Sequence, residues 1–361
     1  MSAIPVPAVS SGAKTRWVIY VKRLLFMAMG CVIALVIAEI GLRAMHLAPA
    51  LGISTVSAKD FARLPGIYAP HQYVRDLQKP ALPFTVTIDS LGFRGAEFTR
   101  TKPANQLRVV MLGDSYVYGD FVDDEQTLPV QLEQRLRKAC GDVLVINGGV
   151  GGTTIIDQAP MLQRMLPLSP DAVVLVYVVD DFANLANEKS SWDLLAENRV
   201  KKSRFPLSVL YPVLRNTALW NLALKFRATR INQETATNLK QAFTEDRSAT
   251  SSRLRDRYGV ALIAMRDTLK AHGIPFVFTM YPASKELPAS SENLKWIEQF
   301  AASQGIPEVN FRDALRASSL PDTALYQLPE DGHPDARGYA IAAEPLAQRL
   351  LASMSGPACK R

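Results

Sequence analysis

Residues 107–115 read LRVVMLGDS, an apolar run that ends abruptly in glycine, aspartate and serine. Such a run is typical of a strand that is buried on both faces, as the strands of parallel sheets are. Glycine followed by short polar residues predicts a turn at the end of that strand. Open α/β sheets carry their reactive groups at the carboxyl ends of the strands. The stretch therefore predicts an α/β domain with Ser115 at the edge of its central sheet.

Further apolar runs alternate with amphipathic stretches. Thr127 and Pro129 are typical of a helix start, and Leu132 and Leu136 then share one face of that helix. This alternation predicts a parallel sheet that is covered by helices on both faces. The other strands of the sheet are expected at residues 142–147, 172–179, 274–280 and 309–311, further helices at residues 262–269 and 339–354, and a separate short strand at residues 84–88.

An apolar segment near the N-terminus carries no charge from residue 24 to residue 38 and continues past Glu39. It is long enough to cross the hydrocarbon core of a bilayer, which takes about 20 helical residues. Basic residues are concentrated before the segment, so the positive-inside rule predicts a cytoplasmic N-terminus. We expect residues 1–16 to form a cytoplasmic tip and residues 17–45 a transmembrane anchor. The alternative is a cleaved signal peptide, because residues 48–50 (APA) resemble a cleavage site.

Composition divides the rest of the chain. Residues 46–83 contain prolines without a clear hydrophobic period and are expected to form a stalk or linker, followed by one domain over residues 84–361. A helical insertion is expected over about residues 184–257, either as a lid or substrate platform or as a cap without a role in substrate choice. The chain of 361 residues has a formal charge of +7 that is spread along its length. Nucleic acid is therefore not an expected partner.

Three cysteines fit an exported domain. Cys31 lies inside the apolar segment, which leaves Cys140 and Cys359. In an oxidising compartment these two can form a disulfide. Cys140 also follows Leu132 and Leu136 at helical spacing, so it can equally be a core residue without a partner.

A serine at a strand end is a weak nucleophile and needs a base to take its proton. His333, within residues 330–334 (EDGHP), is the histidine with carboxylates beside it in sequence, and we expect it to be that base. A neighbouring carboxylate would hold its imidazole in the required tautomer. The histidines and cysteines lack the spacing of metal ligands, so neither a metal nor a cofactor is expected.

The chain resembles the SGNH/GDSL hydrolases from about residue 84 to residue 351. The resemblance is carried by residues 110–116 (VMLGDSY), 147–152 (NGGVGG) and 331–334 (DGHP) followed by Gly338 and Tyr339. It implies a flavodoxin-like three-layer α/β/α fold, with Ser115 as nucleophile and His333 as base. It also implies an oxyanion hole built from the backbone N–H groups of Ser115 and Gly152. The leading anchor and residues 92–95 (GFRG) resemble membrane-anchored bacterial members of the family.

Two positions depart from the family pattern. The usual acid, three residues before the histidine, would be Glu330, but related anchored members use the spacing that here gives Asp331, and we expect Asp331 to be the acid. The third block normally ends in an asparagine that donates to the oxyanion, and Asp180 stands in that place. An ionised aspartate cannot donate a hydrogen bond. We therefore expect a weakened oxyanion hole unless Asp180 is protonated or Asn184 reaches the site.

The resemblance implies a serine hydrolase anchored in a bacterial inner membrane, with its catalytic domain in the periplasm. It would cleave or transfer a small acyl ester through an acyl-enzyme on Ser115. An O-acetyl group of an envelope glycan and a lipid ester are the two substrate classes considered. The alternative, favoured by Asp180, is a binding or assembly protein of the envelope that keeps the fold but little catalysis.

Overall fold

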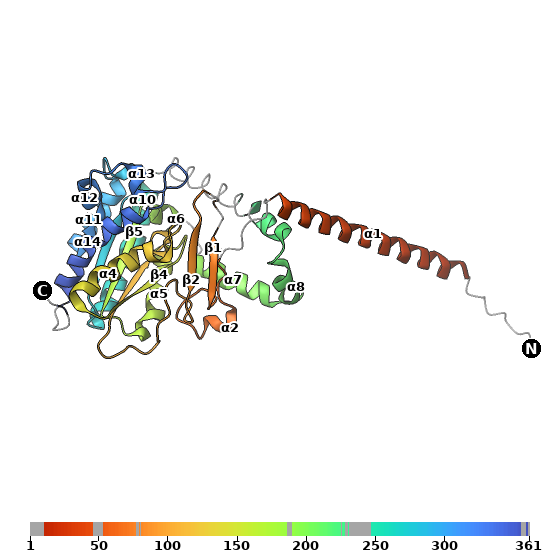
Figure 1. Ribbon diagram of the computed structural model, residues 1–361, viewed down its shortest axis with the longest axis horizontal. Coiled ribbons are helices and arrows are strands. Elements are labelled where there is room, and N and C mark those ends of the chain that lie inside the picture. Colours follow the sequence, from red (N-terminus) through yellow and green to blue (C-terminus); the bar gives the residue numbers. More distant parts are fainter. Residues whose placement is uncertain are drawn as a thin grey trace, which may run out of the picture. The chain divides into compact units, whose positions relative to one another are not determined.

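Five parallel strands form the central sheet in the order β4-β3-β5-β6-β7, as the computed structural model of the chain shows (Figure 1). The structure describes residues 11–45, 53–76, 79, 81–185, 190–224, 226–227, 230, 247–354 and 359. These fall into two compact units, one of residues 1–49 with 210–230 and the other of residues 50–209 with 231–361. The sheet belongs to the second unit, which contains the expected catalytic residues Ser115, Asp331 and His333 and is therefore called the catalytic unit here. The predicted α/β class with a five-stranded parallel sheet is confirmed.

The strands of the central sheet coincide with apolar runs of the sequence that end at glycine or polar residues. Their bounds are β1 Gln72–Asp76, β2 Phe84–Ile88, β3 Leu107–Gly113, β4 Val143–Gly149, β5 Ala172–Val178, β6 Phe276–Tyr281 and β7 Glu308–Asn310. The longer helices are α1 Ser11–Ala44, α4 Leu128–Cys140, α5 Ile155–Met165, α7 Ser191–Ser203, α8 Leu207–Leu214, α10 Arg247–Ala271, α11 Glu292–Ser303 and α14 Ala336–Ser353. The short helices are α2 Ala58–Phe61, α3 Ser115–Tyr118, α6 Asp180–Leu185, α12 Phe311–Ala317 and α13 Asp322–Leu325. The 3₁₀ turns are η1 Asp124–Gln126, η2 Leu166–Leu168 and η3 Ser284–Glu286.

Both faces of the sheet are buried, because successive side chains of each strand point to opposite sides. In β5 every residue is buried. Val173 and Leu175 pack with α5, α10 and α11, whereas Val174 and Val176 pack with α4, α12 and α14. The continuous apolar runs of the sequence are therefore explained by a sheet that lies between two helical layers.

Residues 53–76 differ from the expected stalk. Val56 and Ile67 are buried, and β1 pairs with β2 in an antiparallel ribbon in which Val74 lies opposite Val86. This stretch belongs to the catalytic unit. Its apolar residues belong to three different structures: the β-bridge between Thr55 and Tyr68, the single turn of α2, and the two-stranded sheet of β1 and β2. The sequence of this stretch therefore has no single hydrophobic period. The expected strand at residues 84–88 is confirmed as β2.

The expected helical insertion begins at the end of α6 and contains α7 and α8. Helix α10 begins at Arg247, earlier than the helix predicted at residues 262–269. Within the catalytic unit, α7 packs against α2. Residues 231–246, also part of the expected insertion, lie outside the described residues. The first unit contains α1, in which residues 16–44 are long and apolar enough to span a membrane.

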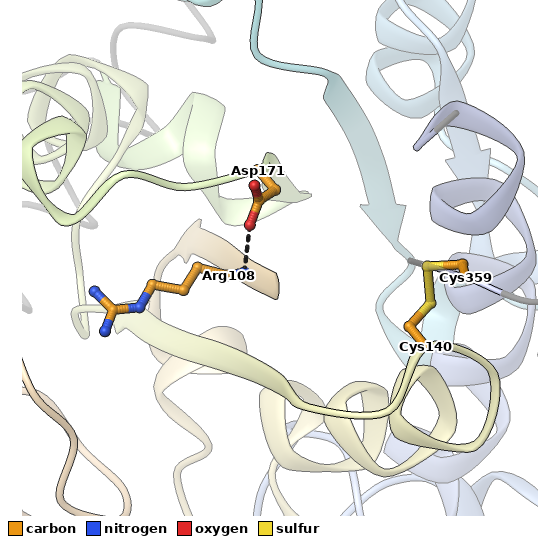
Figure 2. The surroundings of a disulfide bond; sticks show 4 residues. All are labelled: Arg108, Cys140, Asp171 and Cys359. Carbon is orange, nitrogen blue, oxygen red and sulfur yellow. Dashed lines mark hydrogen bonds between the residues drawn. A yellow bond between two sulfur atoms is a disulfide. The ribbon is translucent and has the colours of Figure 1, made fainter. Parts of the chain in front are cut away.

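Arg108 is a buried cation in an otherwise apolar strand. Its side chain is completely buried, and its guanidinium donates to the carbonyl oxygens of residues 99–101 and Leu168 at 2.7–3.2 Å. Its backbone N–H donates to Asp171 Oδ2 at 2.7 Å (Figure 2). A buried charge is tolerated only where such partners surround it. Arg108, at the start of β3, thus binds residues 99–101, which precede β3, and Leu168 and Asp171, which precede β5.

A disulfide joins Cys140, the last residue of α4, to Cys359 in the C-terminal tail (Figure 2). The sequence left open whether Cys140 pairs or packs, and the structure shows that it does both. Its side chain is buried beside Leu136 and other residues of the α4–α14 layer. The bond closes a loop across 219 positions of the chain.

Replacing Cys140 by serine is expected to destabilise the catalytic unit, because the disulfide restricts the unfolded chain. The expected loss is about 2–4 kcal/mol, or a melting temperature lower by roughly 5–15 °C. Circular dichroism of the detergent-solubilised protein measures it, with Cys31→Ser as the control that changes nothing. Equal melting temperatures for Cys140→Ser and the parent would contradict a stabilising disulfide.

Candidate active site

Ser115 lies at the carboxyl end of the central strand β3, where it begins α3. Gly113 is required before it, because a Cβ there would lie 2.4 Å from Val117 Cγ2. The Asp114 carboxylate accepts a hydrogen bond from the Tyr116 backbone N–H at 2.9 Å and so caps the turn. The chain therefore changes from strand to helix within two residues, and Ser115 occupies the first helical position.

The glycine cluster after β4 lies against the same turn. A Cβ at Gly149 would lie 2.1 Å from the Tyr118 backbone nitrogen, so only glycine allows this approach. A Cβ at Gly151 would lie 3.9 Å from Ser115 Cβ. Gly152 follows with φ of +73°, in the left-handed region that favours glycine. The structure thus brings the peptide of residues 151–152 next to Ser115.

His333 reaches Ser115 from a loop before α14. Its Nε2 lies 2.7 Å from Ser115 Oγ, and its Nδ1 makes a hydrogen bond to Asp331 Oδ1. Asp331 Oδ1 also accepts from the His333 backbone N–H at 2.9 Å. The Tyr116 hydroxyl donates to the Gly332 carbonyl at 3.1 Å and ties this loop to the nucleophile turn. Ser115, His333 and Asp331 therefore lie in one hydrogen-bonded row.

Asp331 has a second charged partner. Lys79, in the connection between β1 and β2, forms an ion pair with Asp331 Oδ2. The same ammonium donates to the Glu330 carbonyl at 3.0 Å and lies 5.0 Å from the centre of the Phe121 ring. The Phe121 ring in turn contacts the His333 imidazole edge-on, with centroids 5.4 Å apart. Lys79 thus holds Asp331 from the side opposite the histidine, whereas the Glu330 side chain is exposed.

Asp120 is a second carboxylate near the imidazole. Its Oδ2 lies 3.9 Å from His333 Nε2, the nitrogen that faces Ser115. Burial raises the pKa of Asp120, and the charges of His333 and Arg94 oppose that rise. The imidazole is therefore placed between Asp331 at Nδ1 and Asp120 near Nε2.

The surrounding charges shift both members of the histidine–aspartate pair. Burial lowers the pKa of His333, but the hydrogen bond to Asp331 and the charges of Asp120 and Asp331 outweigh it, so this pKa is raised. Burial raises the pKa of Asp331, but hydrogen bonds from His333 and Lys79 outweigh it and hold this pKa well below its usual range. Asp331 is consequently ionised at neutral pH.

Arg94 supports the loop that follows the nucleophile. Its side chain is buried, and its guanidinium donates to the carbonyls of Tyr118, Gly119 and Val122 at 2.7–3.0 Å. Its Nε also pairs with Asp124 at 2.8 Å. The guanidinium lies 5.0 Å from the centre of the Tyr118 ring. This one side chain therefore fixes the loop that carries Asp120 and Phe121.

Asp180, the residue expected in the third oxyanion position, begins α6 directly after β5. The structure describes its backbone but not its side chain, and the same holds for Asn184. Both residues lie beyond the carboxyl end of a strand that neighbours β3. Their relation to the oxyanion stays a prediction.

Three residues of the site were missed in the sequence. Asp120 lies five positions after Ser115, so a carboxylate one turn beyond the nucleophile was the available signal. Arg94 lies in the turn of residues 92–95 (GFRG), and the available signal was a charged side chain directly after Phe93. Lys79 had no local signal, because it meets Asp331 across 252 positions of the chain.

The arrangement has the groups that acyl transfer requires: a hydroxyl, an imidazole within hydrogen-bond distance of it, and an ionised carboxylate behind the imidazole. Several solved structures are similar to this chain. A putative lipolytic protein of the G-D-S-L family from Desulfitobacterium hafniense is 15% identical, with 67% of this chain and 98% of that chain covered and a TM-score of 0.40. An acetylxylan esterase from Geobacillus stearothermophilus is 13% identical, with 73% and 99% covered and a TM-score of 0.39.

A lipase/acylhydrolase from Enterococcus faecalis is 15% identical, with 68% of this chain and 95% of that chain covered and a TM-score of 0.37. No curated protein matches the chain. The model of the GDSL-like lipase/acylhydrolase family matches residues 111–341. That match spans more than half of the chain and includes both Ser115 and His333, and the chain belongs to the GDSL-like lipase/acylhydrolase family.

Proposed function

We propose that this chain is a serine esterase or acyltransferase that forms an acyl-enzyme on Ser115. The observation that carries the proposal is the row of Ser115 Oγ, the His333 imidazole and the Asp331 carboxylate. His333 Nε2 takes the hydroxyl proton as Oγ forms a bond to the ester carbonyl carbon. The tetrahedral intermediate then expels the alcohol, which receives that proton. Water, or the hydroxyl of an acceptor, releases the acyl group by the same steps in reverse.

The developing oxyanion needs donors. In this proposal they are the backbone N–H groups of Ser115 and Gly152, which suit the role because residues 151–152 lie beside the nucleophile. Asp180 replaces the third donor of the family pattern. A second candidate function follows from that replacement: an envelope binding or assembly protein with little catalysis. An intact Ser115–His333 contact favours the enzyme.

We further propose that α1 anchors the protein in a membrane with the catalytic unit on the extracytoplasmic side. Basic residues before the apolar segment support this orientation, as does a disulfide in the catalytic unit, because disulfides persist in oxidising compartments. The substrate we propose is a small acyl ester. An O-acetyl group of an envelope glycan is the first class to test, and a lipid ester is the second.

Replacing Ser115 by alanine should abolish both labelling by a fluorophosphonate and hydrolysis of a short acyl ester. The loss in kcat is expected to be on the order of 10⁴-fold or more, because the nucleophile itself is removed. Gel fluorescence and a spectrophotometric assay measure the two effects on the full-length protein. A folded parent protein that shows no serine-dependent labelling would support the binding protein instead.

Alanine at Asp331 and at Glu330 separates the two candidate acids. Asp331→Ala should lower kcat by about 10⁴-fold, because the imidazole loses the carboxylate that sets its tautomer. Glu330→Ala should leave kcat within a few-fold of the parent, since that side chain is exposed. Steady-state kinetics with melting temperatures as the folding control distinguish the outcomes. A larger loss for Glu330→Ala would show that the acid is assigned wrongly.

Asp120→Asn should move the acid limb of the pH profile. The negative charge of Asp120 contributes to the raised pKa of His333, and the base works only when the imidazole is neutral. Removing that charge lowers the pKa of His333, so kcat/KM should persist to a lower pH than in the parent. Asp313→Asn, at an exposed position of α12, is the matched control. A limb that stays in place or moves upward would refute the coupling.

A further inference from the structure

The apolar segment of α1 contains one acidic residue, Glu39. Its carboxylate accepts hydrogen bonds from the backbone N–H groups of Ala218 at 2.7 Å and Leu219 at 3.0 Å. Arg43, one turn further along α1, donates to the same carboxylate at 2.7 Å. A carboxylate in a membrane-spanning segment is costly unless it has partners. Here the partners are the Arg43 guanidinium and the first backbone N–H groups of a helical stretch that begins at Ala218.

A third contact joins the same two segments. Arg43 Nη2 donates to the carbonyl oxygen of Asn216 at 2.7 Å, so residues 216–219 are bound at one end of α1. Residues 210–230 form one compact unit with the N-terminal segment, although they are far from it in sequence. Glu39 accepts from unpaired N–H groups at a helix start, which is the position where a negative charge is most stabilising. The chain segment at residues 210–230 is therefore held at the end of the apolar helix.

The surface of this segment is apolar and basic. Helix α8 consists largely of apolar residues and none of them is buried. Its Val213 is 67% exposed, and Phe226, beyond α8, is 69% exposed. Arg215 and Arg227 lie between and beside these apolar residues. Apolar side chains interspersed with arginines are typical of helices that lie in the interface of a bilayer.

We propose that residues 210–227 bind the surface of the lipid bilayer, with their apolar side chains at the level of the acyl chains and with Arg215 and Arg227 among anionic headgroups. The inference rests on the proposed membrane anchor. The bilayer is the occupant because the segment is hydrogen-bonded to the end of the helix that would span it, and because its charge complements anionic lipid. This part of the insertion would then be a membrane-binding element.

The test uses the full-length protein in vesicles that contain an anionic phospholipid. In a Cys31→Ser background, single cysteines at Val213 and Phe226 are labelled with an environment-sensitive fluorophore. Val260→Cys is the matched control, because Val260 is 70% exposed on α10 in the catalytic unit. The labels at positions 213 and 226 should emit at shorter wavelength and be quenched several-fold more by lipids that carry a quencher than the label at position 260.

Equal quenching at the three positions would overturn the proposal. The proposal would also be overturned if the quenching disappeared when the protein is diluted with more lipid. That result would show that a second copy of the protein, and not the bilayer, covers the surface. Glu39→Leu should reduce quenching at position 213 while the melting temperature of the catalytic unit stays unchanged. Flotation of the vesicles after alkaline extraction tests the anchor separately. A protein that fails to float lacks the anchor, whereas one that floats with water-exposed labels refutes only the inference.

Discussion

A hydrogen bond of 2.7 Å between Ser115 and His333 joins two loops that are 218 positions apart. Close packing at the carboxyl edge of the sheet positions the turn that carries Ser115. Gly113 and Gly149 admit neighbours at distances that any Cβ would block, so β3, α3 and β4 meet at one point. The Tyr116 hydroxyl then fixes the histidine loop to the same turn. Close packing at Gly113 and Gly149, together with the Tyr116 side chain, brings Ser115 and His333 together.

The electrostatic arrangement follows from that geometry. Asp331 lies between an imidazole and an ammonium, and both partners favour its ionised form. In the proposed mechanism, this ionised carboxylate stabilises the imidazolium that forms when Ser115 loses its proton. Asp120 adds a second negative charge on the other side of the ring. The two carboxylates raise the pKa of His333, which makes its imidazole a stronger base. The same shift means that the imidazole is neutral only at a higher pH.

Local patterns allowed much of this to be predicted. The strands at the sheet centre and the residues Ser115, Gly152 and His333 stand in short motifs whose geometry is local. What escaped prediction depends on contacts across the fold. Lys79 meets Asp331 from the connection of a two-stranded ribbon, in a stretch whose sequence has no hydrophobic period. The linker expected over residues 46–83 rests on the same lack of a period. Asp180 shows another limit: a motif identifies the position but not what the substituted side chain does there.

Glu39 shows how such long-range contacts bear on function. An ionised carboxylate in an apolar helix is energetically unfavourable when it has no partner. Besides Arg43 of the same helix, the backbone N–H groups of Ala218 and Leu219 donate to that charge. The anchor and the insertion thus depend on one another, although nearly half of the chain separates them. The insertion was expected to be either a lid or substrate platform or a cap without a role in substrate choice, and its residues 216–219 are instead hydrogen-bonded to α1.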